Sequence, residues 1–228
     1  MLSVVIPTLN AERTLAATLT SLVPAAVDGF VRDVVVADGG SRDLTLTIAE
    51  AVGCTVVRAP KGRGAQLAAG ARAAKCGWLL FLHADTVLDE DWVRSAGRFI
   101  AAAQTGSGKE AAAFRFALDA DGPGARLLER FVALRCFLFA MPYGDQGLII
   151  SRALYDAVGG FTPMEIMEDV NMVRRVGRRR LTVLSARAVT GAERYRREGI
   201  IRRGLRNLTC LSLYFLRVPP RIIARLYG

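Results

Sequence analysis

Hydrophobic positions in the first hundred residues of this chain fall into two alternating patterns. Short continuous apolar runs rich in Val, Leu and Ile alternate with stretches whose apolar residues recur every three to four positions. The continuous runs are typical of strands buried on both faces, and the longer spacing is typical of helices that cover a sheet. We therefore predict strands over residues 3–7, 33–37, 54–58 and 78–82, and helices over residues 12–22, 45–52, 64–75 and 90–103.

The second half of the chain follows a less regular pattern. We predict strands over residues 111–118 and 147–151, and helices over residues 123–140, 168–176 and 198–216. The alternation of strands and helices predicts an α/β fold with a mostly parallel central sheet flanked by helices. Bound molecules in such folds lie beyond the carboxyl ends of the strands, so the loops that follow the strands carry the candidate chemistry.

Asp38 ends the second predicted strand and is followed by two glycines. Glycine permits a positive φ and a close approach of the backbone to a bound molecule. A carboxylate in this place suits the polar edge of a base or a ribose. The same residues also suit a tight turn in which Asp43 caps the next helix. The local sequence leaves both interpretations open.

The segment Lys61-Gly-Arg-Gly64 stands at the start of a predicted helix. Cations and free backbone N–H groups at a helix N-terminus attract phosphate. The segment is not a P-loop, because GxxxxGK[ST] is absent, and a dinucleotide fingerprint would follow the first strand. It therefore indicates either a phosphate site or a solvated turn.

His83-Ala-Asp85 follows the most apolar of the predicted strands. A carboxylate in this place can hold Mg²⁺ or Mn²⁺ together with substrate phosphates. His83 is either a second ligand or a histidine whose hydrogen bonds are satisfied at the edge of the sheet. It is the only histidine of the chain, which excludes an HExxH zinc motif and a multi-histidine iron site.

Two polar segments of the second half are further candidates. Glu168-Asp169 opens a predicted helix, where acidic residues stabilise the helix dipole. One of these carboxylates could instead act as a general base toward an acceptor hydroxyl. The glycine-flanked loop Tyr143-Gly-Asp-Gln-Gly147 is either part of an acceptor pocket or an ordinary turn.

Positive charge is concentrated in the last quarter of the chain. Residues 172–228 contain 15 basic and two acidic residues, whereas residues 1–171 contain 16 basic and 19 acidic residues. The predicted helix over residues 198–216 combines arginines with apolar residues at helical spacing. We consider three roles for it, namely docking on the core, contact with an anionic membrane surface and, least favoured, binding of nucleic acid.

Neither a membrane span nor a secretion signal is evident in the chain. No apolar run approaches the roughly 18 residues that cross a bilayer, and the N-terminus lacks the basic region of a signal peptide. We therefore predict a cytoplasmic protein, with peripheral contact to the inner face of the membrane through the basic tail as an extension of that prediction.

Five segments, taken in this order, resemble a family 2 glycosyltransferase of the GT-A fold, which has a Rossmann-like nucleotide-binding half. They are Ser3-Val-Val-Ile-Pro-Thr-Leu-Asn10, Val36-Ala-Asp-Gly-Gly-Ser-Arg-Asp43, Lys61-Gly-Arg-Gly64, Phe81-Leu-His-Ala-Asp85 and Met167-Glu-Asp169. Three further segments resemble a small stand-alone bacterial subfamily labelled arsenosugar-biosynthesis type or radical-SAM-associated. These are Pro142-Tyr-Gly-Asp-Gln-Gly147, Ser185-Ala-Arg187 and Ile223-Ala-Arg-Leu-Tyr227.

The resemblance implies an inverting transfer of one sugar from a nucleotide-sugar donor to a hydroxyl acceptor, assisted by Mn²⁺ or Mg²⁺. A UDP-sugar is the favoured donor and a GDP-sugar the alternative, and the acceptor is a small molecule or is lipid-linked. The implied nucleotide-binding residues are Pro7, Thr8, Asn10, Glu12, Asp38, Lys61 and Arg63. The implied metal ligands are Asp85 and His83, the catalytic carboxylate is Asp169 or, less favoured, Glu168, and the acceptor pocket contains Tyr143, Gly144, Asp145 and Gln146.

The resemblance also divides the chain. We expect one GT-A catalytic domain over residues 1–185, with a nucleotide-sugar-binding half (1–103) and an acceptor half (104–185), followed by a basic helical segment over residues 186–228. His83 stands where the family's DxD motif has its first aspartate, which favours Mn²⁺ because Mn²⁺ accepts imidazole better than Mg²⁺ does. The QxxRW motif of processive synthases is missing, which favours a single transfer.

Two other functions remain open from the sequence. A nucleotidyltransferase shares the α/β core and a Gly-Arg phosphate loop, although its glycine-rich loop usually follows the first strand. A catalytically inactive protein that binds a nucleotide-sugar or docks on a membrane is consistent with the loss of the first DxD aspartate. The presence of Asp85 and Asp169 argues against that second alternative.

Overall fold

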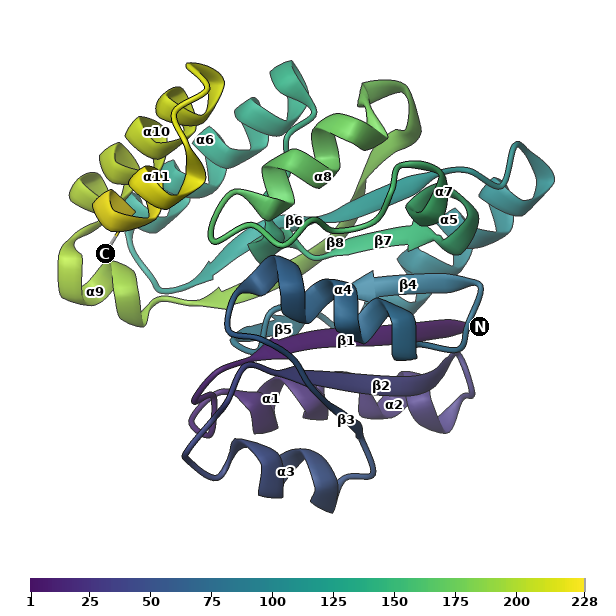
Figure 1. The fold of residues 1–228 in the computed structure, drawn as a ribbon. Coiled ribbons are helices and arrows are strands. Elements are labelled where there is room, and N and C mark those ends of the chain that lie inside the picture. The colour runs from purple at the N-terminus through teal and green to yellow at the C-terminus, as the bar shows by residue number, and fades with distance from the viewer. Residues whose placement is uncertain (228) are drawn as a thin grey trace.

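One eight-stranded sheet organises the chain (Figure 1). Its strands are β1 (Leu2–Thr8), β2 (Val31–Asp38), β3 (Thr55–Arg58), β4 (Trp78–Phe81), β5 (Thr86–Leu88), β6 (Ala111–Asp119), β7 (Leu148–Ser151) and β8 (Leu181–Gly191). They lie in the order β3-β2-β1-β4-β7-β6-β8-β5. The computed structural model describes residues 1–227, with the side chains of all of them except Arg194, Arg196, Arg197, Ile200 and Ile201.

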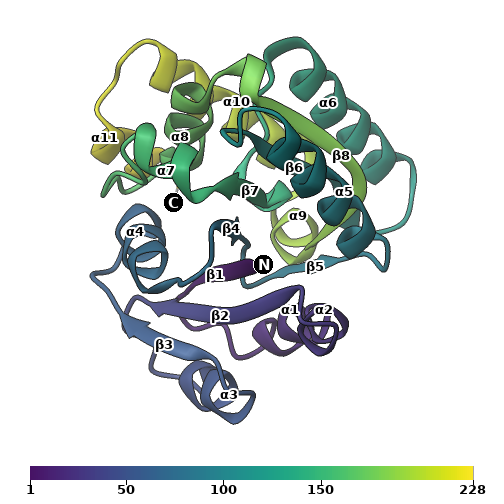
Figure 2. The same ribbon diagram turned by 90° about the vertical axis from the view of Figure 1, so that its right-hand side faces the viewer.

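Helices cover both faces of this sheet (Figure 2). They are α1 (Leu15–Thr20), α2 (Val23–Val27), α3 (Thr45–Ala51), α4 (Arg63–Ala73), α5 (Trp92–Thr105), α6 (Pro123–Phe139), α7 (Arg152–Ala157), α8 (Glu168–Val176), α9 (Glu193–Glu198), α10 (Ile200–Phe215) and α11 (Pro220–Tyr227). The short 3₁₀-helices η1 (Gly144–Gln146) and η2 (Arg178–Arg180) complete the elements. The predicted α/β class is therefore confirmed.

The first half of the sheet is parallel, as its apolar runs predict. Strand β1 pairs in parallel with β2 and β4, and β2 pairs in parallel with β3. Every residue of β1 is buried, because successive side chains enter opposite cores. Val4 and Ile6 join the core beneath α1 and α5, whereas Val5 packs with Leu67 of α4. The helix predicted over residues 12–22 is confirmed in part, as the shorter α1, and a second short helix, α2, follows it with Pro24 in its first turn.

The second half of the sheet is mixed. Strand β7 runs antiparallel to both β4 and β6, β5 runs antiparallel to β8, and β6 and β8 are parallel. The pairing of β7 with β4 and β6 joins the two predicted halves of the chain in one sheet. The loop that follows β4 and the 3₁₀-turn that precedes β7 therefore meet at one edge of the fold.

Strand β8 was not evident in the sequence, and it runs across the domain boundary predicted at residue 185. Its buried positions alternate through Leu184, Ala186, Ala188 and Thr190, with exposed residues between them. Three of these four residues are small or polar, so the alternation of hydrophobic and polar positions that marks a strand is weak here. The arginines nearby in the sequence obscure it further. The helical part of the predicted C-terminal segment begins only at Glu193.

Helices α10 and α11 dock on the core, one of the three roles considered for the basic segment. Cys210, Leu211 and Ile223 are buried together with Met167 and Val170 at the start of α8. The boundary between α10 and α11 follows the sequence, since Pro220 begins α11. Within residues 1–227 we find no helix with the length and hydrophobicity needed to cross a bilayer.

Gly70 permits the close packing of α4 on β1, and it provides a test of this arrangement. A Cβ at position 70 would lie 2.4 Å from Cγ1 of Val5. Gly70→Ala should therefore lower the free energy of unfolding by about 1–3 kcal/mol, because the helix must move off the strand. Urea denaturation followed by circular dichroism measures this change.

Gly97 of α5 is the matched control for Gly70→Ala. A Cβ there meets only Cε2 of Phe30, at an ordinary contact distance of 3.9 Å. Gly97→Ala should raise stability by roughly 0.5–1 kcal/mol through the higher helix propensity of alanine. Equal effects of the two substitutions would contradict the proposed packing of α4.

Candidate active site

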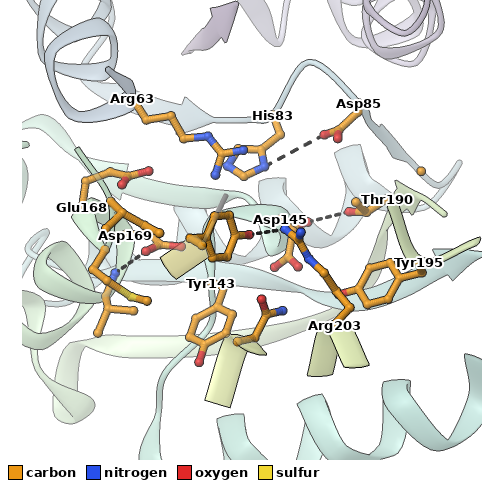
Figure 3. Close-up of a pocket in the computed structure, with 16 residues that line it drawn as sticks. Arg63, His83, Asp85, Tyr143, Asp145, Glu168, Asp169, Thr190, Tyr195 and Arg203 are labelled. Carbon is orange, nitrogen blue, oxygen red and sulfur yellow. Dashed lines mark hydrogen bonds and ion pairs between the residues drawn. The ribbon is translucent and has the colours of Figure 1, made fainter. Parts of the chain in front are cut away.

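Segments far apart in the sequence meet in one pocket beyond the carboxyl end of β4 (Figure 3). Side chains from the start of α4, the β4–β5 loop, the turn before β7, the start of α8, the end of β8 and the C-terminal helices line it. The lining residues that the sequence analysis singled out are Arg63, His83, Asp85, Tyr143, Asp145, Glu168 and Asp169. The pocket thus joins the candidate metal ligands to the candidate catalytic carboxylates.

His83 and Asp85 fit a shared divalent ion. Nδ1 of His83 lies 4.0 Å from Oδ1 of Asp85, too far for a hydrogen bond but within the span of one ion about 2.1 Å from each atom. Among the described side chains, no group of three or more Asp, Glu, His or Cys residues could hold a metal by itself. The pair therefore suits an ion that completes its coordination with substrate phosphates and water.

Gly144 connects the metal side of the pocket to the carboxylate pair. Its backbone N–H donates a hydrogen bond to Oδ2 of Asp169 at 2.7 Å. A Cβ at this position would lie 2.6 Å from Nε2 of His83 and 3.4 Å from Oδ2 of Asp169. Only glycine lets the backbone approach both side chains this closely without displacing the imidazole.

The carboxylate pair enters the pocket from an unusual backbone turn. Met167, which precedes the pair, has a φ of 65°, in the left-handed region that residues other than glycine adopt infrequently. Burial of its side chain with Cys210, Leu211 and Ile223 of the C-terminal helices holds this conformation. The packing of α10 and α11 thus fixes the direction from which Glu168 and Asp169 approach the pocket.

Glu168 is a buried acid whose pKa is raised to about 7. The main cause is its burial, with only 3% of the residue exposed, and the neighbouring charge of Asp169 adds to it, while Arg63 acts in the opposite direction. Burial by itself lowers the pKa of the Arg63 guanidinium, but the acidic groups around it, Glu168 foremost, raise that pKa overall.

Asp145 is a second acid with a perturbed proton affinity. Burial raises its pKa to about 6, against the opposing effect of Arg135, and Asp169 and Asp85 raise it further. Oδ1 of Asp145 is buried and accepts no hydrogen bond from the described residues. The pocket therefore contains several carboxylates that a nearby cation or a bound proton would stabilise.

The residues predicted for the nucleotide lie mostly outside this pocket, at the ends of β1 and β2, in the loop after β1 and just before α4. Two of their side chains join the loops after β1 and β2: Oδ1 of Asn10 accepts from the N–H of Arg42 at 2.9 Å, and Oε2 of Glu12 accepts from the N–H of Leu44 at 3.0 Å. Thr8 and Asp38 are buried, Pro7 belongs to β1, and Lys61 is exposed. Arg63 is the one member of that predicted set among the described pocket residues.

Asp38 holds the turn that follows β2. Its carboxylate accepts hydrogen bonds from the N–H groups of Gly40 and Ser41 and from the hydroxyls of Ser41 and Thr8. Burial raises its pKa, but these hydrogen bonds outweigh burial and lower it overall. Asp43 accepts from the N–H and hydroxyl of Thr45 at the start of α3. The geometry is that of the tight-turn interpretation, and contact of Asp38 with a nucleotide stays a prediction.

Gln146 supports the acceptor loop from behind and does not line the pocket described here. Its side chain is buried, with Nε2 donating to the carbonyl of Phe114 at 2.9 Å and Oε1 accepting from Arg135 at 3.3 Å. The guanidinium of Arg135 also stacks on the ring of Tyr143 at 3.4 Å. Gln146 and Arg135 thus position Tyr143, which does line the pocket.

The sequence analysis missed the pocket wall that the C-terminal helices contribute. Tyr195, Arg203, Asn207 and Tyr227 line the pocket, together with Thr190 at the end of β8. The spacing of Arg203 and Asn207 offered a signal, because the two lie four residues apart on the same face of α10 as the buried Leu211. Docking of this segment on the core was the favoured prediction, but the residues that would line the pocket were not named.

Comparison with known proteins identifies the first half of the chain. Residues 3–106 match the family model described as Glycosyl transferase family 2. This match covers somewhat under half of the chain and contains the β1–β4 core and the candidate metal ligands. A comparison with curated proteins found no match.

Solved structures extend the similarity to most of the chain. A mycobacterial protein is 25% identical with a TM-score of 0.58, over 84% of this chain and 65% of that one. Glucosyl-3-phosphoglycerate synthase from Mycobacterium tuberculosis, in complex with Mn²⁺, UDP and glucosyl-3-phosphoglycerate, is 25% identical with a TM-score of 0.55, over 84% of this chain and 70% of that one. TarS from S. aureus, at 16% identity and a TM-score of 0.65 over 99% of this chain and 69% of that one, shows the fold alone.

These comparisons support a family 2 glycosyltransferase. The predicted GT-A architecture agrees with the observed mixed α/β sheet and its flanking helices. The chain spans less than two thirds of the length of the mycobacterial protein and about two thirds of the other two.

The raised pKa of Glu168 predicts how stability depends on pH. In the unfolded chain the carboxyl ionises near its ordinary value of 4.5, whereas in the folded protein it keeps its proton until about pH 7. The folded state therefore binds more protons between these values, and stability falls as the pH rises through this window. Glu168→Gln should reduce that fall and should be more stable than the parent protein at pH 7.5.

Urea denaturation at pH 5.0 and pH 7.5 measures this difference. Glu50→Gln on the exposed face of α3 serves as the control and should leave the pH dependence unchanged. An identical pH dependence in Glu168→Gln and the parent protein would contradict the raised pKa.

Proposed function

We propose that this protein transfers one sugar from a nucleotide-sugar donor to a hydroxyl of an acceptor, with inversion at the anomeric carbon. The observation that carries the proposal is the single pocket that His83 and Asp85 share with Glu168 and Asp169. Displacement at a sugar carbon needs charge stabilisation on the side of the leaving group and a base on the side of the attacking hydroxyl. This pocket offers candidates for both.

The nucleotide would lie across the loops that follow β1 and β2. Those loops are held together by Asn10 and Glu12, whose side chains accept backbone hydrogen bonds from the opposite loop. Arg63, at the start of α4, lines the pocket, and nearby acidic groups, Glu168 foremost, keep its guanidinium charged. We assign it to the pyrophosphate, which it can reach while the sugar occupies the space near Asp145.

Asp85 and His83 would hold the divalent ion. When bound there, the ion would stabilise the negative charge that develops on the leaving nucleoside diphosphate. A carboxylate and an imidazole suit Mn²⁺, and the similar mycobacterial synthase was solved with Mn²⁺ and UDP. Gly144 keeps the imidazole in place, because the ring rests against the backbone of the turn.

Asp169 would be the base that removes the proton from the acceptor hydroxyl. Backbone N–H groups of Gly144 and Val170, each at 2.7 Å, orient its two oxygens. Each oxygen keeps a second lone pair for the hydroxyl. Glu168 is the less favoured alternative, because a pKa of about 7 leaves much of it protonated at neutral pH. A single displacement with base and leaving group on opposite sides of the sugar inverts its configuration.

Tyr143 and Asp145 would contact the acceptor, and the wall formed by the C-terminal helices would limit its size. We favour a UDP-sugar over a GDP-sugar as donor, in line with the UDP complex of the similar synthase. A small or lipid-linked acceptor, a single transfer, the narrower subfamily and a cytoplasmic location remain predictions of the sequence.

Replacing the proposed base should separate chemistry from donor binding. Asp169→Asn should lower turnover by about 10²–10⁴-fold, the usual contribution of a general base. The affinity for the nucleoside diphosphate should stay the same, because this residue faces the acceptor. Nucleoside diphosphate release and calorimetry measure the two quantities, with Asp156→Asn as the control.

Asp156 lies on the exposed side of α7, so its substitution should leave both quantities unchanged. A parallel loss of turnover and donor affinity in Asp169→Asn would show that the residue supports the fold of the site instead.

Removal of the proposed metal ligand should abolish the metal dependence of nucleotide binding. We expect UDP to bind the parent protein more tightly with Mn²⁺ than with a chelator, whereas Asp85→Asn should bind UDP equally in both conditions. The reason is that this carboxylate would hold the proposed ion, whose positive charge would attract the diphosphate. Isothermal titration calorimetry measures both affinities.

Asp28→Asn, at the exposed end of α2, is the control and should keep the metal dependence. If Mn²⁺ does not alter UDP binding to the parent protein, then the role of Asp85 is wrong. If GDP but not UDP shows metal-dependent binding, the proposed preference for UDP is wrong, whereas the proposed metal site is supported.

A further inference from the structure

Helix α6 is apolar on two opposite faces, and the core uses only one of them. The inward face, with Ala125, Val132 and Cys136, packs against Phe116 and Leu118 of β6. The outward face carries a stripe of large apolar residues at positions i, i+4, i+7 and i+11, which is continuous along a helix. This α6 stripe consists of Leu127, Phe131, Leu134 and Leu138, each between 47% and 61% exposed.

Helix α10 repeats this arrangement beside α6. Arg203 and Asn207 face the pocket, and Cys210 is buried. Its other side exposes an α10 stripe, made of Leu205, Leu208 and Phe215. Figures 1 and 2 both place α6 and α10 at the end of the molecule opposite α3. Two neighbouring helices therefore present large apolar side chains that the fold itself leaves uncovered.

Arginines accompany both stripes. Arg178 donates hydrogen bonds to the carbonyls of Phe137 and Leu138 at the end of α6, at 3.2 and 2.8 Å. Arg174 stands over the ring of Phe215 at 5.1 Å. Arg130 and Arg202 are exposed on α6 and α10. Each stripe of exposed apolar side chains therefore has at least one arginine beside it.

We propose that the α6 and α10 stripes dock on the surface of a lipid bilayer that contains anionic lipids. Helices with an apolar face bordered by arginine bind in the interface, with the apolar side chains among the acyl chains and the cations at the headgroups. Each basic residue near an anionic surface adds to the attraction between protein and membrane. The protein would rest on the membrane, since none of its described helices can cross one.

A second copy of the chain is the less suitable occupant of these stripes. A symmetric dimer through this face brings the same patch of both copies together. The arginines beside the stripes of both copies would then share one interface, and like charges brought together destabilise an interface. An anionic membrane satisfies both the apolar stripes and the charge around them.

Co-sedimentation of the full chain with vesicles tests the proposal. We expect binding to vesicles in which a third of the lipid is phosphatidylglycerol, weaker binding to pure phosphatidylcholine, and a loss of binding as salt rises. Phe131→Ser combined with Leu134→Ser should lower the partition coefficient about tenfold or more, because two apolar side chains no longer enter the membrane. Both residues are more than half exposed, so the fold should persist, and circular dichroism checks it.

Val27→Ser combined with Leu44→Ser is the matched control. These residues are 80% and 62% exposed, but they lie on α2 and beside α3, at the other end of the molecule. The control pair should bind vesicles like the parent protein. Equal losses in both double variants would show non-specific adsorption and overturn the proposal.

Two other outcomes would also overturn it. The first is a failure of the parent protein to bind anionic vesicles. The second is a dimer in light scattering that becomes a monomer in Phe131→Ser/Leu134→Ser, which would identify the stripes as a self-association surface. None of these measurements uses sugar transfer, so the docking proposal can fail or stand independently of the proposed function.

Discussion

The hydrogen bond from the backbone of Gly144 to Asp169 is the contact on which the rest of the pocket depends. It ties the turn before β7 to the start of α8, and it leaves the same glycine in contact with the imidazole of His83. Three segments separated by many residues in sequence are brought to one point by a position that has no side chain. Because a Cβ would meet the imidazole first, the absence of a side chain at this residue keeps His83 and Asp169 close together.

Charge in the pocket is balanced around that junction. Asp85, Asp145, Glu168 and Asp169 share a small space with Arg63, and the C-terminal helices add Arg203 on the far side. The raised pKa values of Asp145 and Glu168 show that protons compensate part of this negative charge near neutral pH. A cation bound as proposed would compete with those protons, so its binding would release protons.

The sequence predicted the nucleotide-side half well, because its signals are local. Continuous apolar runs specify β1, β2 and β4, and Asp85 follows directly from its place after one of them. Glu168 and Asp169 were found for the same reason, at the start of a periodic helix. Strand β8 was missed because Ala186 and Ala188 carry little hydrophobic signal.

Residues whose roles depend on distant contacts could not be predicted. Gln146 lies in a polar, glycine-flanked loop that suggests a pocket residue. Its amide instead forms hydrogen bonds with Phe114 and Arg135 behind the pocket. Arg203 resembles one more surface arginine, yet it is 5% exposed and paired with Glu198. Only the packing of α10 against the start of α8 decides which side of that helix faces the pocket.

The contacts between α10 and α11 have a consequence for the order in which the pocket is assembled. Arg203 lies 4.5 Å from the ring of Tyr227, and Arg206 donates to the backbone carbonyl of Tyr227 at 2.9 Å. During synthesis the parallel strands and the loops that join Asn10 to Arg42 emerge before these helices. Until α11 packs against α10, Met167 lacks its contact with the cluster around Ile223. The side of the pocket that Tyr227 lines is then open to water. The wall of the pocket is therefore complete only after residue 227 has been made, because Tyr227 lines it.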